Sequence, residues 1–412
     1  MADHSQAGAR VVIAGAGHAG GALAALLRQL GFEGSIVLVG EEPTAPYQRP
    51  PLSKLWLKGE AELDAIILRP LEFYADSAIE LIRDVRVEHI DRQRRVASLS
   101  SGRSLGYDHL ILATGMRPNR LSVPGAELDN VLSLRTVADA EALKMALGPG
   151  RKLVIIGGGY IGLEVAASAR ARGSEVTILE RESRLLVRSS CAALSEFFRS
   201  FHEARGVRFR LSASVSRLVG EAGAVTAVEL ADGERIACDA VLVGVGGAPN
   251  QELAAAAGLE VDGGVVVGQD SCTSDPAVFA IGDVSRRPVP LYGRSFRLES
   301  VPGALEQAKQ AAHAILERPA PTPEVPWNWS DQYDLKLQMA GLAVDADEVL
   351  LRGDPASGRF AVFHLKGDRV RAMEAINAPP EFMVGRHLIA SGAPVSRERL
   401  TDPEVSMKAV TA

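Results

Sequence analysis

The sequence is poor in cysteine and has no long apolar run. Its three cysteines stand far apart, at Cys191, Cys238 and Cys272, with no Cys-x-x-Cys pair and no Cys/His ligand spacing. This pattern indicates neither a disulfide framework nor a metal site, and we expect all three thiols to be inert. No uninterrupted apolar run reaches about 18 residues and no basic leader opens the chain, so we expect no membrane contact and a cytoplasmic location.

The chain also lacks an excess of positive charge. Its formal net charge of −6 argues against a generally basic surface for nucleic acid. Glycine is abundant instead: 40 of the 412 residues exceed the usual share of about 7%, and they cluster after apolar runs, where a backbone can approach a ligand closely. At roughly 100–200 residues per domain, the length favours several domains, and we expect three.

A βαβ unit opens the chain. We expect a buried parallel strand at residues 10–15, an Ala/Leu-rich helix at 19–30 and a second strand at 35–39. Between the first strand and the helix lies a Gly-x-Gly-x-x-Gly run, whose glycines permit a tight turn, the approach of a pyrophosphate to the backbone and close helix packing. The expected dinucleotide contacts are Gly15, Gly17, His18, Ala19 and Gly20.

An acidic residue should follow the second strand and accept hydrogen bonds from ribose hydroxyls. Glu41, 21 residues past Gly20, is the candidate, and Glu42 could substitute for it. We assign no catalytic role to His18, which occupies a position where a small polar residue is tolerated.

The same unit recurs in the middle of the chain. A strand is expected at 152–156, a helix at 160–171 and a strand at 175–179, so the sequence contains a divergent duplication. The expected dinucleotide contacts here are Gly157, Gly159, Tyr160, Ile161, Gly162 and Glu180. Glu180, 18 residues past Gly162, favours NADH because a carboxylate repels the 2′-phosphate of NADPH, although Arg181 and Arg184 leave NADPH open.

The rest of the chain suggests how these units are joined. Two similar apolar strands, at 107–115 and 238–246, each end in a glycine-containing turn and carry the chain between the nucleotide domains. The four prolines within 319–326 predict a stiff connector. After it we expect strands at 348–352, 359–366 and 369–376 and a helix at about 380–390.

The expected fold class is therefore α/β, with two Rossmann-like dinucleotide-binding domains and a C-terminal α+β domain. The expected division is a discontinuous first nucleotide domain (1–114 and 247–325), a second nucleotide domain (115–246) and the C-terminal domain (326–412).

The segment 273–283, which ends in Gly282-Asp283, resembles the two-dinucleotide flavoproteins that share the glutathione reductase fold. The resemblance implies that the first fingerprint holds FAD and the second NADH. It also implies that Asp283 contacts the ribityl chain of FAD, with Thr114 and Gly115 nearby.

A narrower resemblance extends over nearly the whole chain. The stretches 50–54, 135–136, 157–166, 299–308 and 327–332 resemble the putidaredoxin reductase-like, NADH-dependent ferredoxin reductases of bacterial oxygenase systems. The combination is specific to that family, whereas any single stretch is not. It implies that Arg135, Val301 and Trp329 contact FAD, that Lys54 lies beside the flavin N5 edge, and that Glu164 is the ion-pair partner of Lys54.

These residues also have plainer explanations. Lys54 could be a solvated helix lysine, Glu164 an ordinary helix residue and Arg135 a surface arginine. Trp327 and Trp329 lie two apart, so on an extended segment both face one side, where they either cover the flavin or anchor the third domain's core.

The expected function depends on the absence of cysteine from Glu41 to residue 70. Disulfide reductases of this fold carry a cysteine pair there and related peroxidases a single cysteine, but residues 41–70 contain none. The expected activity is FAD-dependent electron transfer from NADH to a [2Fe-2S] ferredoxin that serves a bacterial oxygenase. An NADH oxidase or peroxidase and an apoptosis-inducing-factor-like signalling protein are the alternatives.

Ferredoxins of this kind are acidic, so we expect a docking face with basic residues near the flavin edge. The candidates are Arg69, Lys309 and Lys336, each of which could also be an ordinary solvated side chain.

Overall fold

The first Rossmann-like unit is built on a five-stranded parallel sheet. The structure, a computed structural model, describes residues 8–411. The sheet has the order β19-β7-β1-β2-β3. Its strands are β1 (Arg10–Ala14), β2 (Ser35–Val39), β3 (Ile79–Ile82), β7 (His109–Leu112) and β19 (Val278–Ala280). The predicted strand, helix and strand at the start of the chain are confirmed, with the helix, α1, at His18–Gln29.

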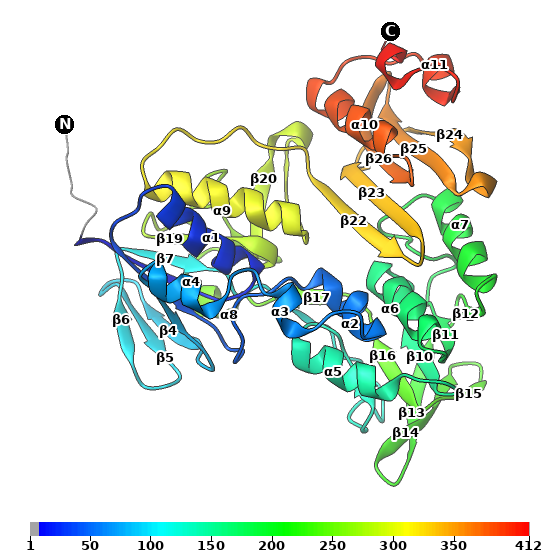
Figure 1. Ribbon diagram of the computed structural model, residues 1–412, viewed down its shortest axis with the longest axis horizontal. Helices are drawn as coiled ribbons and strands as arrows, with labels where there is room; N and C mark the ends of the chain where they lie inside the picture. Colours follow the sequence, from blue (N-terminus) through cyan, green and yellow to red (C-terminus); the bar gives the residue numbers. More distant parts are fainter. Residues whose placement is uncertain (1–7, 412) are drawn as a thin grey trace.

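Both faces of this sheet are covered, which explains the continuous apolar run in β1. Val11 and Ile13 pack under α1 and α9 (Val301–Ile315), while Val12 and Ala14 face a small three-stranded sheet on the other side. That sheet consists of β4 (Val87–Asp91), β5 (Val96–Leu99) and β6 (Ser104–Gly106). In Figure 1, α1 and α9 lie side by side above the sheet and β4, β5 and β6 below it.

The second unit repeats this architecture. Its five-stranded sheet has the order β12-β11-β10-β16-β9, and α6 (Tyr160–Ala171) follows its central strand, β10. The strands are β9 (Val131–Leu132), β10 (Lys152–Ile156), β11 (Glu175–Leu179), β12 (Val207–Arg210) and β16 (Ala240–Val243); α5 (Val137–Ala146) and α7 (Ala192–Glu203) accompany them. A three-stranded sheet of β13 (Val215–Glu221), β14 (Ala224–Leu230) and β15 (Arg235–Ala237) adjoins it. The predicted duplication is therefore confirmed.

Two short strands carry the chain between the units. β8 (Met116–Pro118) leads out of the first unit and β17 (Gly247–Pro249) leads back, and they pair antiparallel. The remaining short elements are η2 (Pro50–Ser53), α2 (Leu55–Lys58), α3 (Leu63–Ile66), α4 (Leu71–Asp76), α8 (Glu252–Ala256), β18 (Val265–Val266), η3 (Gly282–Val284), β20 (Ser285–Val289), η4 (Pro290–Tyr292) and β21 (Arg294–Phe296).

The C-terminal part is a five-stranded antiparallel sheet with helices. Its order is β22-β23-β26-β25-β24. The elements are β22 (Trp327–Gln332), β23 (Leu335–Gly341), β24 (Glu348–Asp354), η5 (Pro355–Ser357), β25 (Arg359–Lys366), β26 (Arg369–Ile376), α10 (Pro379–Ser391), α11 (Arg397–Thr401) and η6 (Met407–Ala409). The three predicted strands and the helix are confirmed. β22 and β23 were not predicted as paired strands, because their polar residues interrupt the apolar alternation.

The C-terminal sheet shares a hydrophobic core with the second unit. Leu337 of β23 and Phe360 of β25 pack in the same buried cluster as Leu163 of α6 and Phe198 of α7. β22 lies against α6 and also touches α9 of the first unit (Figure 1). Within residues 8–411, no helix is long and apolar enough to cross a membrane.

Candidate functional site

The glycines of the first fingerprint have three different tasks. Gly15 has φ +119°, and a Cβ there would lie 2.2 Å from the Ala113 carbonyl oxygen, so only glycine fits this turn between β1 and α1. A Cβ at Gly20 would lie 2.0 Å from the Gly15 carbonyl oxygen, which explains the close packing of α1. A Cβ at Gly17 would have no heavy atom of the described chain within 4 Å, so that side of the backbone is open to a ligand.

The second fingerprint has the same geometry. Gly157 has φ +114°, with its Cβ position 2.3 Å from the Gly244 carbonyl oxygen, and the Cβ position of Gly162 is 2.4 Å from the Gly157 carbonyl oxygen. Gly159 again has open space beside it among residues 8–411. Two anion cradles of equal construction therefore stand at the ends of β1 and β10.

Both cradles lead into helices whose first N–H groups are available. Gly17 and Gly159 are the N-caps of α1 and α6, and neither provides a side-chain cap or is followed by an acidic residue in the first turn. Free N–H groups and the positive end of the helix dipole attract a pyrophosphate. The residues present thus fit two dinucleotides.

Three loops meet around the first fingerprint. They follow β1, β7 and β19, neighbouring parallel strands whose carboxyl ends share one edge of the sheet. Arg135 lies here, with its Nη2 2.9 Å from Asp283 Oδ2 and 3.2 Å from the Cβ position of Gly115. Thr114 Oγ1 donates to the Asn250 carbonyl oxygen at 2.8 Å, which fixes the turn after β7. The structure therefore brings the predicted residues Thr114, Gly115, Arg135 and Asp283 together.

His18 lies at the same edge. Burial lowers the pKa of its imidazole, the charge of Asp283 partly opposes this and the charge of Arg49 adds to it. His18 Nδ1 is buried and has no hydrogen-bond partner within residues 8–411.

Arg49 is a site residue that the sequence argument missed. Its guanidinium donates to the Arg135 carbonyl oxygen at 2.5 Å and pairs with Glu42 at 2.8 Å. It is thus a fixed cation beside the first cradle. The Pro-Pro that follows it, at residues 50–51, is the sequence signal for a rigid turn that could have drawn attention to it.

The two acidic candidates near the first cradle differ in their partners. Glu42 accepts from Tyr47 Oη at 2.5 Å as well as from Arg49. Glu41 is exposed, and its nearest cation is Arg86 at 3.5 Å. Neither carboxylate bonds the fingerprint itself, and the residue directly after β2, in register with Glu180, is Gly40.

Glu180 is tied to the second fingerprint. Its Oε2 accepts from the Gly158 backbone N–H at 2.7 Å and its Oε1 from the Glu182 N–H at 2.9 Å. Arg184 points inward and donates to the Ser190 carbonyl oxygen and Ser195 Oγ, each at 2.8 Å. Arg181 is exposed and pairs with Glu182. On α6, Tyr160 is half-buried and Ile161 exposed.

The Lys54–Glu164 pair connects the two units. Lys54 Nζ lies 2.6 Å from Glu164 Oε2, and Glu164 is buried on α6 directly beyond the second fingerprint. Ser53 Oγ donates to the same carboxylate oxygen at 2.5 Å and Ser330 Oγ to the other at 2.6 Å. The explanation of Lys54 as a freely solvated lysine is therefore wrong, because its ammonium is held by a buried carboxylate.

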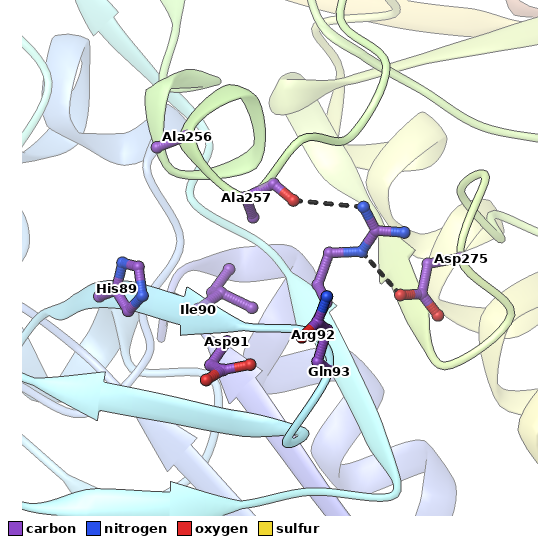
Figure 2. Close-up of a pocket in the computed structure, with 8 residues that line it drawn as sticks. All are labelled: His89, Ile90, Asp91, Arg92, Gln93, Ala256, Ala257 and Asp275. Atoms are coloured by element: carbon purple, nitrogen blue, oxygen red, sulfur yellow. Dashed lines mark hydrogen bonds and ion pairs between the residues drawn. The ribbon is translucent and has the colours of Figure 1, made fainter.

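A polar pocket lies elsewhere, between β4, α8 and the loop before β19 (Figure 2). Its Arg92 donates to Asp275 at 2.7 Å and to the Ala257 carbonyl oxygen at 3.2 Å. These bonds fasten the small sheet to the first unit, and neither fingerprint contributes to the pocket's lining.

Comparison with known proteins agrees with this arrangement. Residues 9–311 match the model of the pyridine nucleotide-disulphide oxidoreductase family, and residues 327–411 match a reductase C-terminal domain. The chain belongs to the pyridine nucleotide-disulphide oxidoreductases. Membership implies FAD and NAD(H) as the two dinucleotides that the cradles fit.

Relatives that match nearly the whole chain narrow the family assignment. A probable ferredoxin reductase, CtmF, from Castellaniella defragrans is 48% identical over 97% of this chain and 98% of its own. Putidaredoxin reductase CamA from Pseudomonas putida is 43% identical over 98% and 96%. The covalent putidaredoxin reductase–putidaredoxin complex superposes with a TM-score of 0.95 at 42% identity, covering 97% of each chain. The resemblance and fold class expected from the sequence are confirmed.

Despite the family's name, no cysteine lies near the cradles at residues 41–70. All three thiols are free, and burial raises the pKa of each, that of Cys238 to about 12. A raised pKa disfavours the reactive thiolate.

The two tryptophans of this oxidoreductase lie on one face of β22, as expected for an extended segment. Their ring centroids are 5.7 Å apart, and Trp327 also packs 5.8 Å from Phe382 of α10. Trp327 therefore joins the C-terminal core, whereas Trp329 is half-buried. Val301 is the first residue of α9.

The three docking candidates are all exposed but lie on different elements. Arg69 precedes α4, Lys309 is on α9 and Lys336 is on β23. Lys336 stands opposite Asp331 in the β22–β23 ladder, so a residue of opposite charge is its cross-strand neighbour. Within residues 8–411, no hydrogen bond joins any of these three side chains to another of the three.

Proposed function

We propose that this protein is an NADH-dependent ferredoxin reductase that passes electrons from NADH through FAD, one at a time, to a [2Fe-2S] ferredoxin serving an oxygenase. The observation that carries this proposal is the Lys54–Glu164 ion pair, which joins the two nucleotide-binding units. Its Lys54 Nζ and Glu164 Oε2 atoms are 2.6 Å apart. A flavin supplies the chemistry that converts a two-electron donor into a one-electron source.

The first cradle is assigned to FAD. The helix α1 N-terminus and Arg49 would neutralise the pyrophosphate, and Arg135 with Asp283 would bind the ribityl and phosphate region. The complete proposed set is Gly15, Gly17, His18, Ala19, Gly20, Glu41, Arg49, Lys54, Thr114, Gly115, Arg135, Asp283, Val301 and Trp329.

The second cradle is assigned to NADH. Glu180 is held at the fingerprint by two backbone N–H groups, in position to accept from ribose hydroxyls. Arg184 is already bound to Ser190 and Ser195 and so is not free for a 2′-phosphate, which favours NADH over NADPH. The proposed set is Gly157, Gly159, Tyr160, Ile161, Gly162 and Glu180.

Electrons are expected to leave the flavin directly. The absence of cysteine at residues 41–70 and the raised pKa values of the three thiols argue against a thiol relay. Relatives named as ferredoxin reductases, and the solved complex of one with its ferredoxin, support an iron–sulfur protein as acceptor. We also propose a cytoplasmic location, where free thiols stay reduced.

Steady-state kinetics test this assignment against an NADH oxidase. The holoprotein, given NADH and a panel of [2Fe-2S] ferredoxins, should reduce at least one of them much faster than it consumes oxygen. Oxygen turnover of the same size with and without ferredoxin would contradict the proposal, and an absence of both activities would favour a signalling role.

A further inference from the structure

A buried chain of hydrogen bonds continues from the Lys54–Glu164 pair into the C-terminal sheet. Ser330 Oγ donates to Glu164 Oε1 at 2.6 Å, Gln332 Nε2 donates to Ser330 Oγ at 3.1 Å, and His202 Nε2 lies 2.8 Å from Gln332 Oε1. Ser330, Gln332 and His202 are each at most 1% exposed. Water therefore does not compete for these bonds, which strengthens them.

The direction of the chain is fixed by its chemistry. The Ser330 hydroxyl uses its single proton on the Glu164 carboxylate, so Gln332 must present its amide N–H₂ to Ser330 and its carbonyl oxygen to His202. His202 must then be the donor at Nε2, which leaves Nδ1 as the unprotonated nitrogen. That nitrogen is buried and has no hydrogen-bond partner among residues 8–411. Every bond thus donates toward Glu164, and aligned bonds polarise one another.

The chain of hydrogen bonds joins three elements from two parts of the molecule. His202 is on α7 and Glu164 on α6 of the second unit, while Ser330 and Gln332 are on β22. Side chains alternate along a strand, so β22 presents Ser330 and Gln332 to α6 and α7 and turns Trp329 to the opposite face. One strand therefore holds the carboxylate with one face and carries Trp329, a proposed flavin contact, on the other.

We propose that Ser330, Gln332 and His202 are positioning residues that orient Glu164 and partly neutralise its charge. They thereby determine how strongly the positive charge of Lys54 acts on the flavin edge. This proposal rests on the proposed function, because it requires FAD beside Lys54. Removing a donor would leave more negative charge on Glu164, draw Lys54 toward it and make electron addition to the flavin less favourable.

The experiment measures the flavin midpoint potential and the rate of flavin reduction by saturating NADH in the holoprotein, without ferredoxin. Ser330→Ala should lower the potential by about 30 mV, the equivalent of a tenfold change in a two-electron equilibrium, and slow reduction several-fold. Ser330→Thr keeps the hydroxyl and should restore both values. Gln332→Leu and His202→Phe, which each remove a donor, should shift the potential in the same direction by smaller amounts, decreasing with distance from Glu164.

A matched control separates positioning from stability. Leu337 stands directly opposite Ser330 in the β22–β23 ladder and is fully buried. Leu337→Val should lower the Tm of the holoprotein through a small cavity but leave the potential unchanged. In a Glu164→Gln background, Ser330→Ala should add no further shift, because its effect acts through that carboxylate.

Two results would overturn the proposal: an unchanged potential and rate in Ser330→Ala with FAD bound, or an equal shift in Leu337→Val. Failure of the proposed function looks different. In that case the wild-type protein would not retain FAD, its flavin would not be reduced by NADH, or the reduced flavin would not pass electrons to a ferredoxin.

Discussion

The Lys54 ammonium lies 2.6 Å from the Glu164 carboxylate, and the two residues come from different nucleotide-binding units. Two hydroxyl donors, Ser53 and Ser330, complete the environment of this carboxylate. A buried carboxylate with one cation and two hydroxyls is well satisfied, so the pair can hold a fixed position where the two units meet.

Replacing Lys54 with methionine keeps the length of the side chain but removes its charge. We expect FAD to remain bound and its reduction by NADH to slow roughly tenfold or more, which corresponds to about 1.4 kcal/mol of barrier. Stopped-flow absorbance of the flavin band measures this rate. Lys58→Met, on the last turn of α2, is the control, and a rate for Lys54→Met equal to that control would contradict a role at the flavin edge.

Gly17 and Gly20 should respond differently to alanine. At Gly20 the new methyl would meet the Gly15 carbonyl oxygen at 2.0 Å, so Gly20→Ala should destabilise the apoprotein itself. At Gly17 the methyl meets no atom of the described chain, and the backbone φ of −81° suits any residue. Gly17→Ala should therefore leave the Tm of the apoprotein nearly unchanged while lowering its FAD content, because the methyl occupies the approach to the pyrophosphate.

The ratio of flavin to protein absorbance and the apoprotein Tm together test this pair of variants. If Gly17→Ala purifies with a full complement of FAD, the first cradle does not hold the pyrophosphate at that glycine.

The sequence predicted both βαβ units, because each combines an apolar strand, a glycine fingerprint and a helix within a short span. It also led to Thr114, Gly115, Arg135 and Asp283, which the structure gathers at one sheet edge. What local pattern could not reveal is the set of long-range partners. Ser330 is 166 residues from Glu164 and Gln332 is 130 from His202, so only the folded chain brings them together.

Arg49 and β22 were missed for related reasons. An arginine in a loop has no periodic signature, and its importance comes from bonds to Arg135 and Glu42 that depend on the tertiary fold. β22 lacks apolar alternation because one of its faces is packed with hydrogen-bonded polar residues. A buried polar face is invisible to a pattern that equates burial with hydrophobicity.

Glu180→Ala tests the second cradle. We expect the KM for NADH to rise roughly tenfold with little change in kcat, since the carboxylate binds ribose and takes no part in hydride transfer. Glu182→Ala, an exposed neighbour paired with Arg181, is the matched control and should leave KM unchanged. An unchanged KM in Glu180→Ala would refute the assignment.

Lys309 tests the ferredoxin-docking face. It is exposed on α9, one helical turn from Leu305 and two from Val301, so it continues an exposed stripe from the proposed flavin contact. Lys309→Glu should slow ferredoxin reduction most at low ionic strength, where screening is weakest. Lys336→Glu should have a smaller effect because its cross-strand neighbour, Asp331, carries the opposite charge. The control is Lys366→Glu at the end of β25. The docking face would lie elsewhere if Lys366→Glu slowed ferredoxin reduction equally, or if the rate of Lys309→Glu did not depend on ionic strength.

His202 should make stability depend on pH. Burial lowers its pKa to about 4; the bond to Gln332 opposes this shift, and Arg205 adds to it. In the unfolded chain the pKa of a histidine is about 6.5. Between about pH 4 and pH 6.5, His202 is therefore protonated in the unfolded state but neutral in the folded state. The stability contributed by the neutral His202 is therefore fully present above about pH 6.5 and is lost as the pH falls toward 4. The loss is about 2 kcal/mol at pH 5.

Replacing His202 with glutamine retains a donor toward Gln332 but removes the titration. The loss of stability between pH 7.5 and pH 5, measured by urea unfolding of the apoprotein, should be smaller in His202→Gln by about that 2 kcal/mol. His89, exposed on β4, provides the control, since His89→Gln should keep the wild-type slope. If His202→Gln and the wild type lose equal stability over this range, then His202 is not the neutral, buried donor at the end of the chain to Glu164.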